Sequence, residues 1–249
     1  MGEVFVITSG KGGVGKTTST ANIGAGLAAA DKKTILIDTD IGLRNLDVIM
    51  GLENRIVYHL VDIIEGGCRI KQALIRDKRY PNLFLLPSAQ TRDKTSVSPE
   101  QMKKLIEQLR DDFDYILIDC MPSLGMITIN AFACADSILI PVQAAYLPAK
   151  GLQQLIKTIG KVRRQINPKL TIEGILLTMV DARTNYAKDI TALLVENYGS
   201  KVRIFENSIP ISVRAAEISA EGISIYEHDP KGKVAAAYQS LTEEVLGDE

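Results

Sequence analysis

Residues 10–17 read GKGGVGKT, and this segment limits what the chain can fold into more than any other. The apolar residues 4–8 before it predict a buried strand, and residues 18–30 after it, rich in Ala, Gly and Leu, predict a packed helix. A strand, a glycine-rich turn and a helix form the frame of a phosphate-binding loop. The alternative is a glycine-rich turn without a phosphate-binding role, in which Lys16 and Thr17 occur by chance. The predicted strand before the turn and the predicted helix after it argue against this alternative. The segment therefore predicts a nucleotide-binding α/β protein.

The residues of this loop have separate roles in a phosphate site. Glycines let the backbone curl so that successive N–H groups face the phosphates, beside the positive end of the helix dipole. The Lys16 ammonium is predicted to reach the β and γ phosphates, and the Thr17 hydroxyl to bind Mg²⁺. The nucleotide-binding residues predicted here are Gly12, Gly13, Val14, Gly15, Lys16, Thr17 and Thr18.

Length and composition fit one α/β domain, 1–249. The chain has 249 residues, of which 46% are apolar, enough for a large core. No apolar run approaches the roughly 18 residues of a membrane span, and no basic-then-apolar leader precedes the first strand, so we expect a cytoplasmic protein. The net charge of −1 argues against bulk coating of nucleic acid, so any DNA contact requires a local basic patch.

The three cysteines, Cys68, Cys120 and Cys134, are odd in number and lack a Cys-x-x-Cys spacing. This pattern indicates neither a disulfide framework nor a zinc site. We expect reduced thiols in the core.

Acidic residues follow two of the predicted strands. Residues 34–37 form a short β-branched strand that leads into Asp38 and Asp40, and residues 115–118 form a similar strand that leads into Asp119. Ligands of parallel α/β sheets bind at the carboxyl ends of the strands, so these acids are predicted beside the phosphate loop. Asp119 matches a Walker B carboxylate, which holds Mg²⁺ through water. The alternative for each acid is capping of the next helix.

Further strands are predicted at 83–86, 137–141 and 172–178, and further helices at 99 onward, 151–166 and 234–246. Ser98 with Gln101 forms a capping box at the start of the helix from 99. We therefore expect a mostly parallel, twisted sheet of seven or so strands with helices on both faces, and the nucleotide at its carboxyl edge.

Residues 11–17, KGGVGKT, resemble the deviant Walker A motif of the ParA/MinD family of P-loop ATPases. Residues 42–52 and 58–65 are similar to MinD, whereas 179–185 and 209–217 are similar to ParA. Residues 120–125 resemble switch II of ParA, although Met121 stands where ParA usually has proline.

The resemblance implies a role for individual residues. Lys11 would cross the interface of an ATP-sandwich dimer to the phosphates bound by the partner, so that hydrolysis depends on dimerisation. Asp40 would orient the attacking water, and Asp38 would lie close to Mg²⁺. The remaining implied contacts are Met179 and Pro210 near the adenine and Arg183 and Arg214 on non-specific DNA. For the two arginines, an ion pair within the chain is the alternative.

As a whole, the resemblance implies a slow ATPase of the ParA type that uses ATP and Mg²⁺, is stimulated by a ParB-like partner, and partitions chromosomes or plasmids on the nucleoid. The acidic residues 243–249 predict no membrane anchor of the MinD kind, and a start at the first strand predicts no helix-turn-helix. A MinD-like regulator of septum placement is the nearest alternative. A metabolic P-loop enzyme, related to dethiobiotin synthetase or nitrogenase reductase, and a non-catalytic binding module remain as others.

Overall fold

The computed structural model describes residues 1–42, 45–89, 97–144 and 148–247, with the backbone alone for 148–150. Residues 43–44 of the MinD-like segment 42–52 lie outside the described residues. In the described part of the chain, seven strands form one sheet in the order β3-β4-β2-β5-β1-β6-β7. They are β1 (Glu3–Ile7), β2 (Thr34–Asp38), β3 (Ile75–Arg76), β4 (Leu83–Leu86), β5 (Tyr115–Asp119), β6 (Ser137–Gln143) and β7 (Thr171–Thr178).

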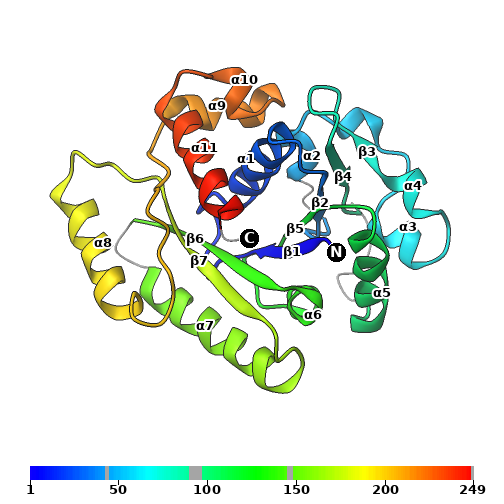
Figure 1. Cartoon of the computed structure of the whole chain (residues 1–249), viewed down its shortest axis with the longest axis horizontal. Helices are drawn as coiled ribbons and strands as arrows, with labels where there is room; N and C mark the ends of the chain where they lie inside the picture. Colours follow the sequence, from blue (N-terminus) through cyan, green and yellow to red (C-terminus); the bar gives the residue numbers. More distant parts are fainter. Residues whose placement is uncertain (43–44, 90–96, 145–147, 248–249) are drawn as a thin grey trace.

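Helices cover both faces of this sheet (Figure 1). One face packs against α1, α2, α9, α10 and α11, and the other against α3, α5, α6, α7 and α8. Their bounds, with those of α4 and the 3-10 helix η1, are α1 (Lys16–Ala29), α2 (Leu46–Ile49), η1 (Glu53–Arg55), α3 (Leu60–Ile64), α4 (Ile70–Ala73), α5 (Pro99–Arg110), α6 (Met126–Cys134), α7 (Pro148–Gln165), α8 (Asn185–Tyr198), α9 (Val213–Glu221), α10 (Ile225–His228) and α11 (Lys233–Leu246). The predicted fold class is confirmed.

The central strands are apolar on both faces. In β1, Val4 and Val6 join the core cluster on one side of the sheet, and Phe5 and Ile7 join the cluster on the other side. Strands of parallel sheets are buried on both faces, so continuous apolar runs replace the alternation seen in half-exposed strands. The sheet is parallel except for the edge strand β3, which pairs with β4 antiparallel.

Local patterns located several elements correctly. The Ser98 hydroxyl accepts a hydrogen bond from the Gln101 N–H (3.2 Å), and the Gln101 side chain accepts one from the Ser98 N–H (2.8 Å), so the capping box is confirmed. The predicted inner face of α11, which includes Tyr238 and Leu241, is buried. The strand β3 and the helices α2, α4, α6, α8, α9 and α10 were not predicted. No helix in the described ranges combines the length and hydrophobicity that a membrane crossing needs.

Candidate nucleotide-binding site

The glycine-rich loop connects β1, in the middle of the sheet, to α1. Gly15 is the N-cap of α1 and has a φ of 83°, and Gly13 has a φ of 72°. Residues other than glycine rarely adopt this left-handed backbone conformation. A Cβ placed on Gly13 would meet no atom within 4 Å, so the backbone angle, and not lack of space, requires glycine there.

The Lys16 side chain folds back into this loop. Its ammonium donates hydrogen bonds to the Ser9 hydroxyl (3.2 Å) and to the Lys11 carbonyl (3.4 Å), and the Ser9 hydroxyl also donates to that carbonyl (2.6 Å). Lys16 is only 7% exposed, and this burial lowers its pKa, against the opposing influence of the nearby Asp119 and Asp40 carboxylates. The charge that is predicted to bind phosphate is therefore held at the centre of the loop.

Two buried carboxyl groups lie side by side next to Lys16. Asp38 and Asp119 are register partners at the carboxyl ends of β2 and β5. Burial raises the pKa of Asp119 to about 7, although hydrogen bonds from Thr17 and Thr20 and the Lys16 charge oppose the rise. Burial, together with the Asp119 charge, raises the pKa of Asp38 well above its ordinary value.

Backbone N–H groups hold the Asp38 carboxyl group in place. The Asp38 carboxylate accepts hydrogen bonds from the Asp40 N–H (2.7 Å) and the Leu46 N–H (3.4 Å). The Asp38 side chain therefore joins β2 to the start of α2 and holds the turn that carries Asp40. Asp40 is partly buried and close enough to Lys16 to influence its pKa.

The donor set fits Mg²⁺. Mg²⁺ prefers hard oxygen ligands, usually one or two carboxylates completed by water and substrate phosphate. Asp119, Asp38 and the Thr17 hydroxyl supply such oxygens beside the phosphate loop, and a divalent cation would offset the cost of burying the two carboxylates. In the described ranges no three His, Cys, Asp or Glu side chains form a group that could hold a metal ion by themselves.

An apolar cavity of about 270 Å³ adjoins the start of α1. Gly15 and Thr18 form its wall on the loop side, and Met179 and Pro210 lie on the opposite segments after β7. The Thr178 hydroxyl donates to the Val14 carbonyl (2.9 Å) and so ties these segments to the loop. Further lining residues are Ile209, Ile211, Ser212, Ala215, Ala216, Ser219 and Tyr238. A flat aromatic base attached to phosphates in the loop has room here.

Two further segments approach the loop. Pro122, in the segment after β5, lies 3.8 Å from the position of a Cβ on Gly12. A Cβ on Gly10 would lie 2.3 Å from the carbonyl carbon and oxygen of Gly151 in the first turn of α7, so the two backbones are in direct contact. Met121, the residue that departs from the ParA pattern, is buried.

Lys11, Arg183 and Arg214 are exposed. Arg183 forms two 2.8 Å hydrogen bonds to the Asp181 carboxylate, and Arg214 lies 3.7 Å from Glu217. The ion pairs considered as the alternative for these arginines are thus present, with 86% and 61% of the two arginine side chains exposed. The Arg183 hydrogen bonds lower the pKa of Asp181 to about 2.

Sequence reasoning missed the hydroxyls that hold the site together. Ser9 bonds Lys16, Thr20 donates to the Asp119 carboxylate (3.3 Å), and the Thr39 hydroxyl donates to the Asp119 carbonyl (2.7 Å). Thr20 is the one with a recognisable signal, since it follows Lys16 by four residues and therefore lies on the same face of α1. No signal in the sequence pointed to the others.

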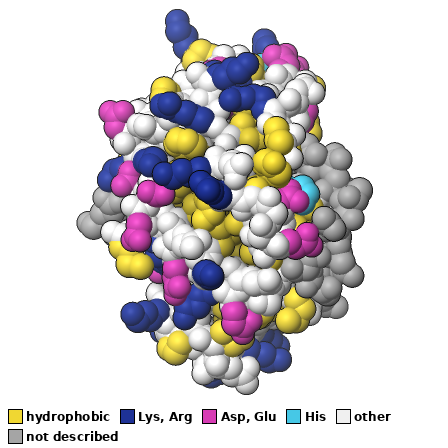
Figure 2. All heavy atoms as spheres, turned by 90° about the vertical axis from the view of Figure 1, so that its right-hand side faces the viewer, with side chains coloured by type: hydrophobic (Ala, Val, Ile, Leu, Met, Phe, Trp, Pro, Cys, Tyr) yellow, Lys and Arg dark blue, Asp and Glu magenta, His cyan; other side chains and the backbone are white. Residues whose placement is uncertain are grey.

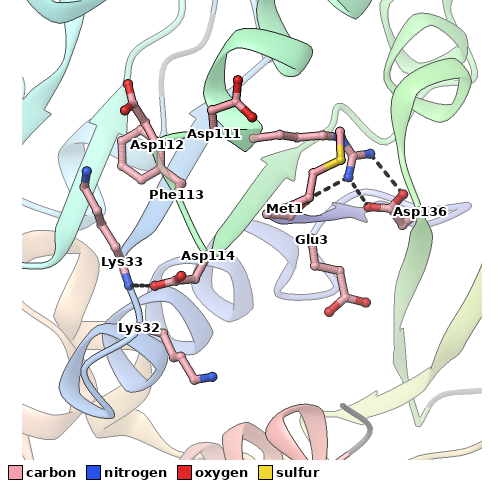
Figure 3. Close-up of a pocket in the computed structure, with 11 residues that line it drawn as sticks. Met1, Glu3, Lys32, Lys33, Asp111, Asp112, Phe113, Asp114 and Asp136 are labelled. Atoms are coloured by element: carbon pink, nitrogen blue, oxygen red, sulfur yellow. Dashed lines mark hydrogen bonds and ion pairs between the residues drawn. The ribbon is translucent and has the colours of Figure 1, made fainter.

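A second hollow, shown in Figure 3, lies at the opposite, amino edge of the sheet. Arg110 donates to Asp136 there (2.6 and 2.9 Å) and to the Gly2 carbonyl (2.7 Å), and the Lys33 N–H donates to the Asp114 carboxylate (2.7 Å). Arg110 and Asp136 form an ion pair in this hollow, and none of its lining residues belongs to the nucleotide site.

Comparison with known proteins agrees with this geometry. Residues 2–172 match a protein-family model described as an AAA domain. The septum site-determining protein MinD of Bacillus subtilis is 39% identical over 252 residues, which cover 100% of this chain and 90% of that protein. The sporulation initiation inhibitor protein Soj of the same organism is 37% identical over 256 residues, covering 100% of both.

Solved structures show the same fold. Cobyrinic acid a,c-diamide synthase from Mycobacterium smegmatis, crystallised with ADP and magnesium, has a TM-score of 0.82 at 26% identity and covers 99% of this chain and 94% of its own. A MinC:MinD cell division protein complex from Aquifex aeolicus gives a TM-score of 0.81 at 32% identity, with 99% and 96% covered. The loop, the paired acids and the relatives together place the chain in the ParA/MinD family of P-loop ATPases, with ATP and Mg²⁺ as its cofactors.

Proposed function

We propose that residues 1–249 form a single ATPase domain of the ParA type, which hydrolyses ATP in a dimer of two chains joined across their nucleotides. Lys16 would hold the γ phosphate, Thr17 and Asp119 the metal, with Asp38 close to it, and Asp40 would orient the attacking water. Positioning and charge neutralisation supply most of the catalysis in phosphoryl transfer, and these residues converge where both are needed.

The environment of Lys11 carries this proposal. Its carbonyl faces the interior of the loop and accepts from Ser9 and Lys16, yet the residue itself is exposed at the rim of the nucleotide site. In the proposed dimer, the exposed Lys11 ammonium would neutralise charge on phosphates bound by a second chain facing the same edge.

Exposed apolar residues near the site support such an interface. Ile211 and Val213 are 59% and 77% exposed beside the apolar cavity, and Met126 is 60% exposed at the start of α6. Met126 begins the helix that follows the segment after β5, so it too belongs to the carboxyl edge of the sheet. Ile211 and Val213 are two residues apart beside the cavity, and neighbouring exposed apolar side chains of this kind commonly mark contact surfaces.

Light scattering after size-exclusion chromatography tests the dimer. With Mg²⁺ and a non-hydrolysable ATP analogue, the wild-type protein should have twice the mass it has with ADP. Lys11→Ala should stay monomeric while it still binds the analogue, and Lys78→Ala, at the opposite edge, should dimerise normally. A Lys11→Ala variant that dimerises and hydrolyses ATP at the wild-type rate would contradict the proposal.

We further propose that the dimer binds DNA non-specifically through Arg183 and Arg214 and partitions chromosomes or plasmids together with a ParB-like activator. Ion pairs this exposed contribute little to stability, so phosphate oxygens can compete for both guanidinium groups. Two subunits would double the number of contacts. The similarity to Soj over the whole chain supports this choice, and nucleoid association in cells would follow from it.

An electrophoretic shift on random-sequence DNA tests this part. Binding should require ATP, weaken as salt rises, and be lost in Arg183→Ala combined with Arg214→Ala, while Lys78→Ala binds as the wild type does. Binding that ignores the nucleotide, or that survives the double substitution, would contradict it.

A MinD-like role in septum placement is the second candidate, favoured by the 39% identity to MinD along the entire chain. It predicts ATP-dependent sedimentation with anionic liposomes and no ATP-dependent DNA shift. The two assays therefore separate the two candidates.

A further inference from the structure

A groove of about 1150 Å³ runs between α5 on one side and α3 and α4 on the other, at the edge of the molecule that Figure 2 faces. Its lining includes Gln101, Lys104, Leu105, Gln108, Leu109 and Asp112 from the α5 side. From the α3 and α4 side come Ile63, Ile64, Cys68, Arg69, Ile70, Lys71 and Gln72. None of these residues belongs to the nucleotide site.

The floor of this groove is apolar. Leu105 and Leu109 lie at its base and are buried, whereas Ile63, Ile64 and Ile70 are half-buried and keep part of their surface open. Figure 2 shows hydrophobic side chains in the hollowed middle of this face. Water held against apolar side chains in a concave site is released at a gain when an apolar partner enters.

The length of the groove suits a short helix. Along α5 and its end, the lining residues run from Gln101 to Asp112 at helical spacing, which at about 1.5 Å per residue is roughly 17 Å, or three turns. A helix of that length buries apolar side chains at i, i+3 or i+4, and i+7 when it lies in a groove.

The charged lining has one dominant sign. Arg69, Lys71 and Lys104 are cationic and exposed, and Asp112 is the one acidic side chain among the described lining residues. The groove thus carries an excess of positive charge in a protein whose net charge is −1. A partner that matches it carries carboxylates beside its apolar stripe.

We propose that this groove is a docking site for an acidic amphipathic helix of a partner protein, with apolar side chains on Leu105 and Ile70 and carboxylates facing Arg69 and Lys104. The concave shape distinguishes this partner from an anionic membrane, since a flat surface would touch the cationic rim and leave the floor empty.

A displayed library of helical peptides, random in charge and in apolar spacing, tests the proposal when it is selected on the full wild-type chain. Enriched peptides should combine an i, i+3/i+4, i+7 apolar stripe with Asp or Glu on its flanks. Their affinity, measured by fluorescence anisotropy at low salt, should fall about tenfold or more in Lys104→Glu and in Arg69→Glu. The matched control is Lys103→Glu, one residue away on α5 and absent from the groove lining, and it should change affinity less than about twofold.

Arg69, Lys103 and Lys104 are all exposed, so the three substitutions should leave folding unaffected, and unchanged ATPase activity and thermal unfolding of the variants check this. Selected peptides that lack acidic residues, or that bind the wild type and Lys104→Glu equally well, would overturn the proposal. It would also be overturned if no peptide were enriched and the protein instead bound anionic vesicles in a way that Arg69→Glu abolishes. The last outcome would identify a membrane surface instead.

Discussion

Replacing Asp119 by asparagine should stabilise the nucleotide-free protein while removing Mg²⁺ and ATP binding. The buried Asp119 carboxyl has a pKa of about 7, raised from an ordinary value of 3.8, because burial disfavours its charged form. The folded protein therefore holds a proton that the unfolded chain has already released. Asparagine keeps a side-chain oxygen that can accept the hydrogen bond from Thr20 but never carries the charge.

The raised pKa fixes the sign and size of the effect. Between pH 4 and 7 the unfolded state binds fewer protons than the folded state, so the stability of the wild-type protein falls as pH rises through this window. The pKa of Asp119 rises by about three units on folding, and each unit corresponds to about 1.4 kcal/mol. At pH 8 the free energy of unfolding of the wild-type protein should therefore be about 4 kcal/mol lower than that of Asp119→Asn. At pH 5 this difference should be about 2 kcal/mol.

Urea unfolding of both proteins at pH 5 and pH 8, with EDTA and without nucleotide, measures this difference. Asp111→Asn, an exposed acid after α5, is the control and should change stability by less than about 0.5 kcal/mol at both values. Added MgADP should stabilise the wild-type protein and not Asp119→Asn. If Asp119→Asn were no more stable than the wild-type protein at pH 8, burial would not be destabilising the charged form of this carboxylate.

Three other substitutions test separate parts of the structure. Lys16→Met should abolish retention on an ATP resin while the far-ultraviolet circular dichroism is unchanged, since it removes a charge and keeps the apolar stem. Gly10→Ala should weaken nucleotide binding, measured by calorimetry, because its Cβ would lie 2.3 Å from the Gly151 backbone and displace the loop or α7. Arg110→Met should lower the free energy of unfolding by about 1–3 kcal/mol in urea titrations, because Arg110 is 13% exposed and bonds Asp136; an unchanged midpoint would exclude a structural role for this pair.

Most of the sheet could be predicted because its strands have short apolar sequences with clear ends. β3 escaped prediction because two residues carry no periodicity, and its antiparallel pairing with β4 is a tertiary contact. The helix α6 escaped for a different reason. It is buried on most sides, so its sequence, MITINAFAC, lacks the polar face by which amphipathic helices are recognised.

The candidate nucleotide site could be predicted from the sequence where the expected function requires a residue type at a fixed spacing. Lys16, Thr17 and the loop glycines belong to a continuous motif, and Asp38 and Asp119 each end an apolar strand. The supporting hydroxyls could not be predicted, because Ser9 and Thr39 meet their partners only through folding. Met179 and Pro210, which the resemblance alone indicated, do line one cavity with Gly15 and Thr18.

The central strands are apolar on both faces, so hydrophobicity alone does not determine the register between neighbouring strands. In β2 and β5, TILID pairs with YILID, and a slip of one residue would exchange apolar side chains between two equally apolar faces. Hydrophobicity therefore penalises such a slip little, whereas moving Asp38 or Asp119 one step into the core would bury a charge without its hydroxyl and N–H partners. The two acids that are predicted to hold the metal would thus also set the register of the central strands, so a variant that loses both should be prone to misregistered folding.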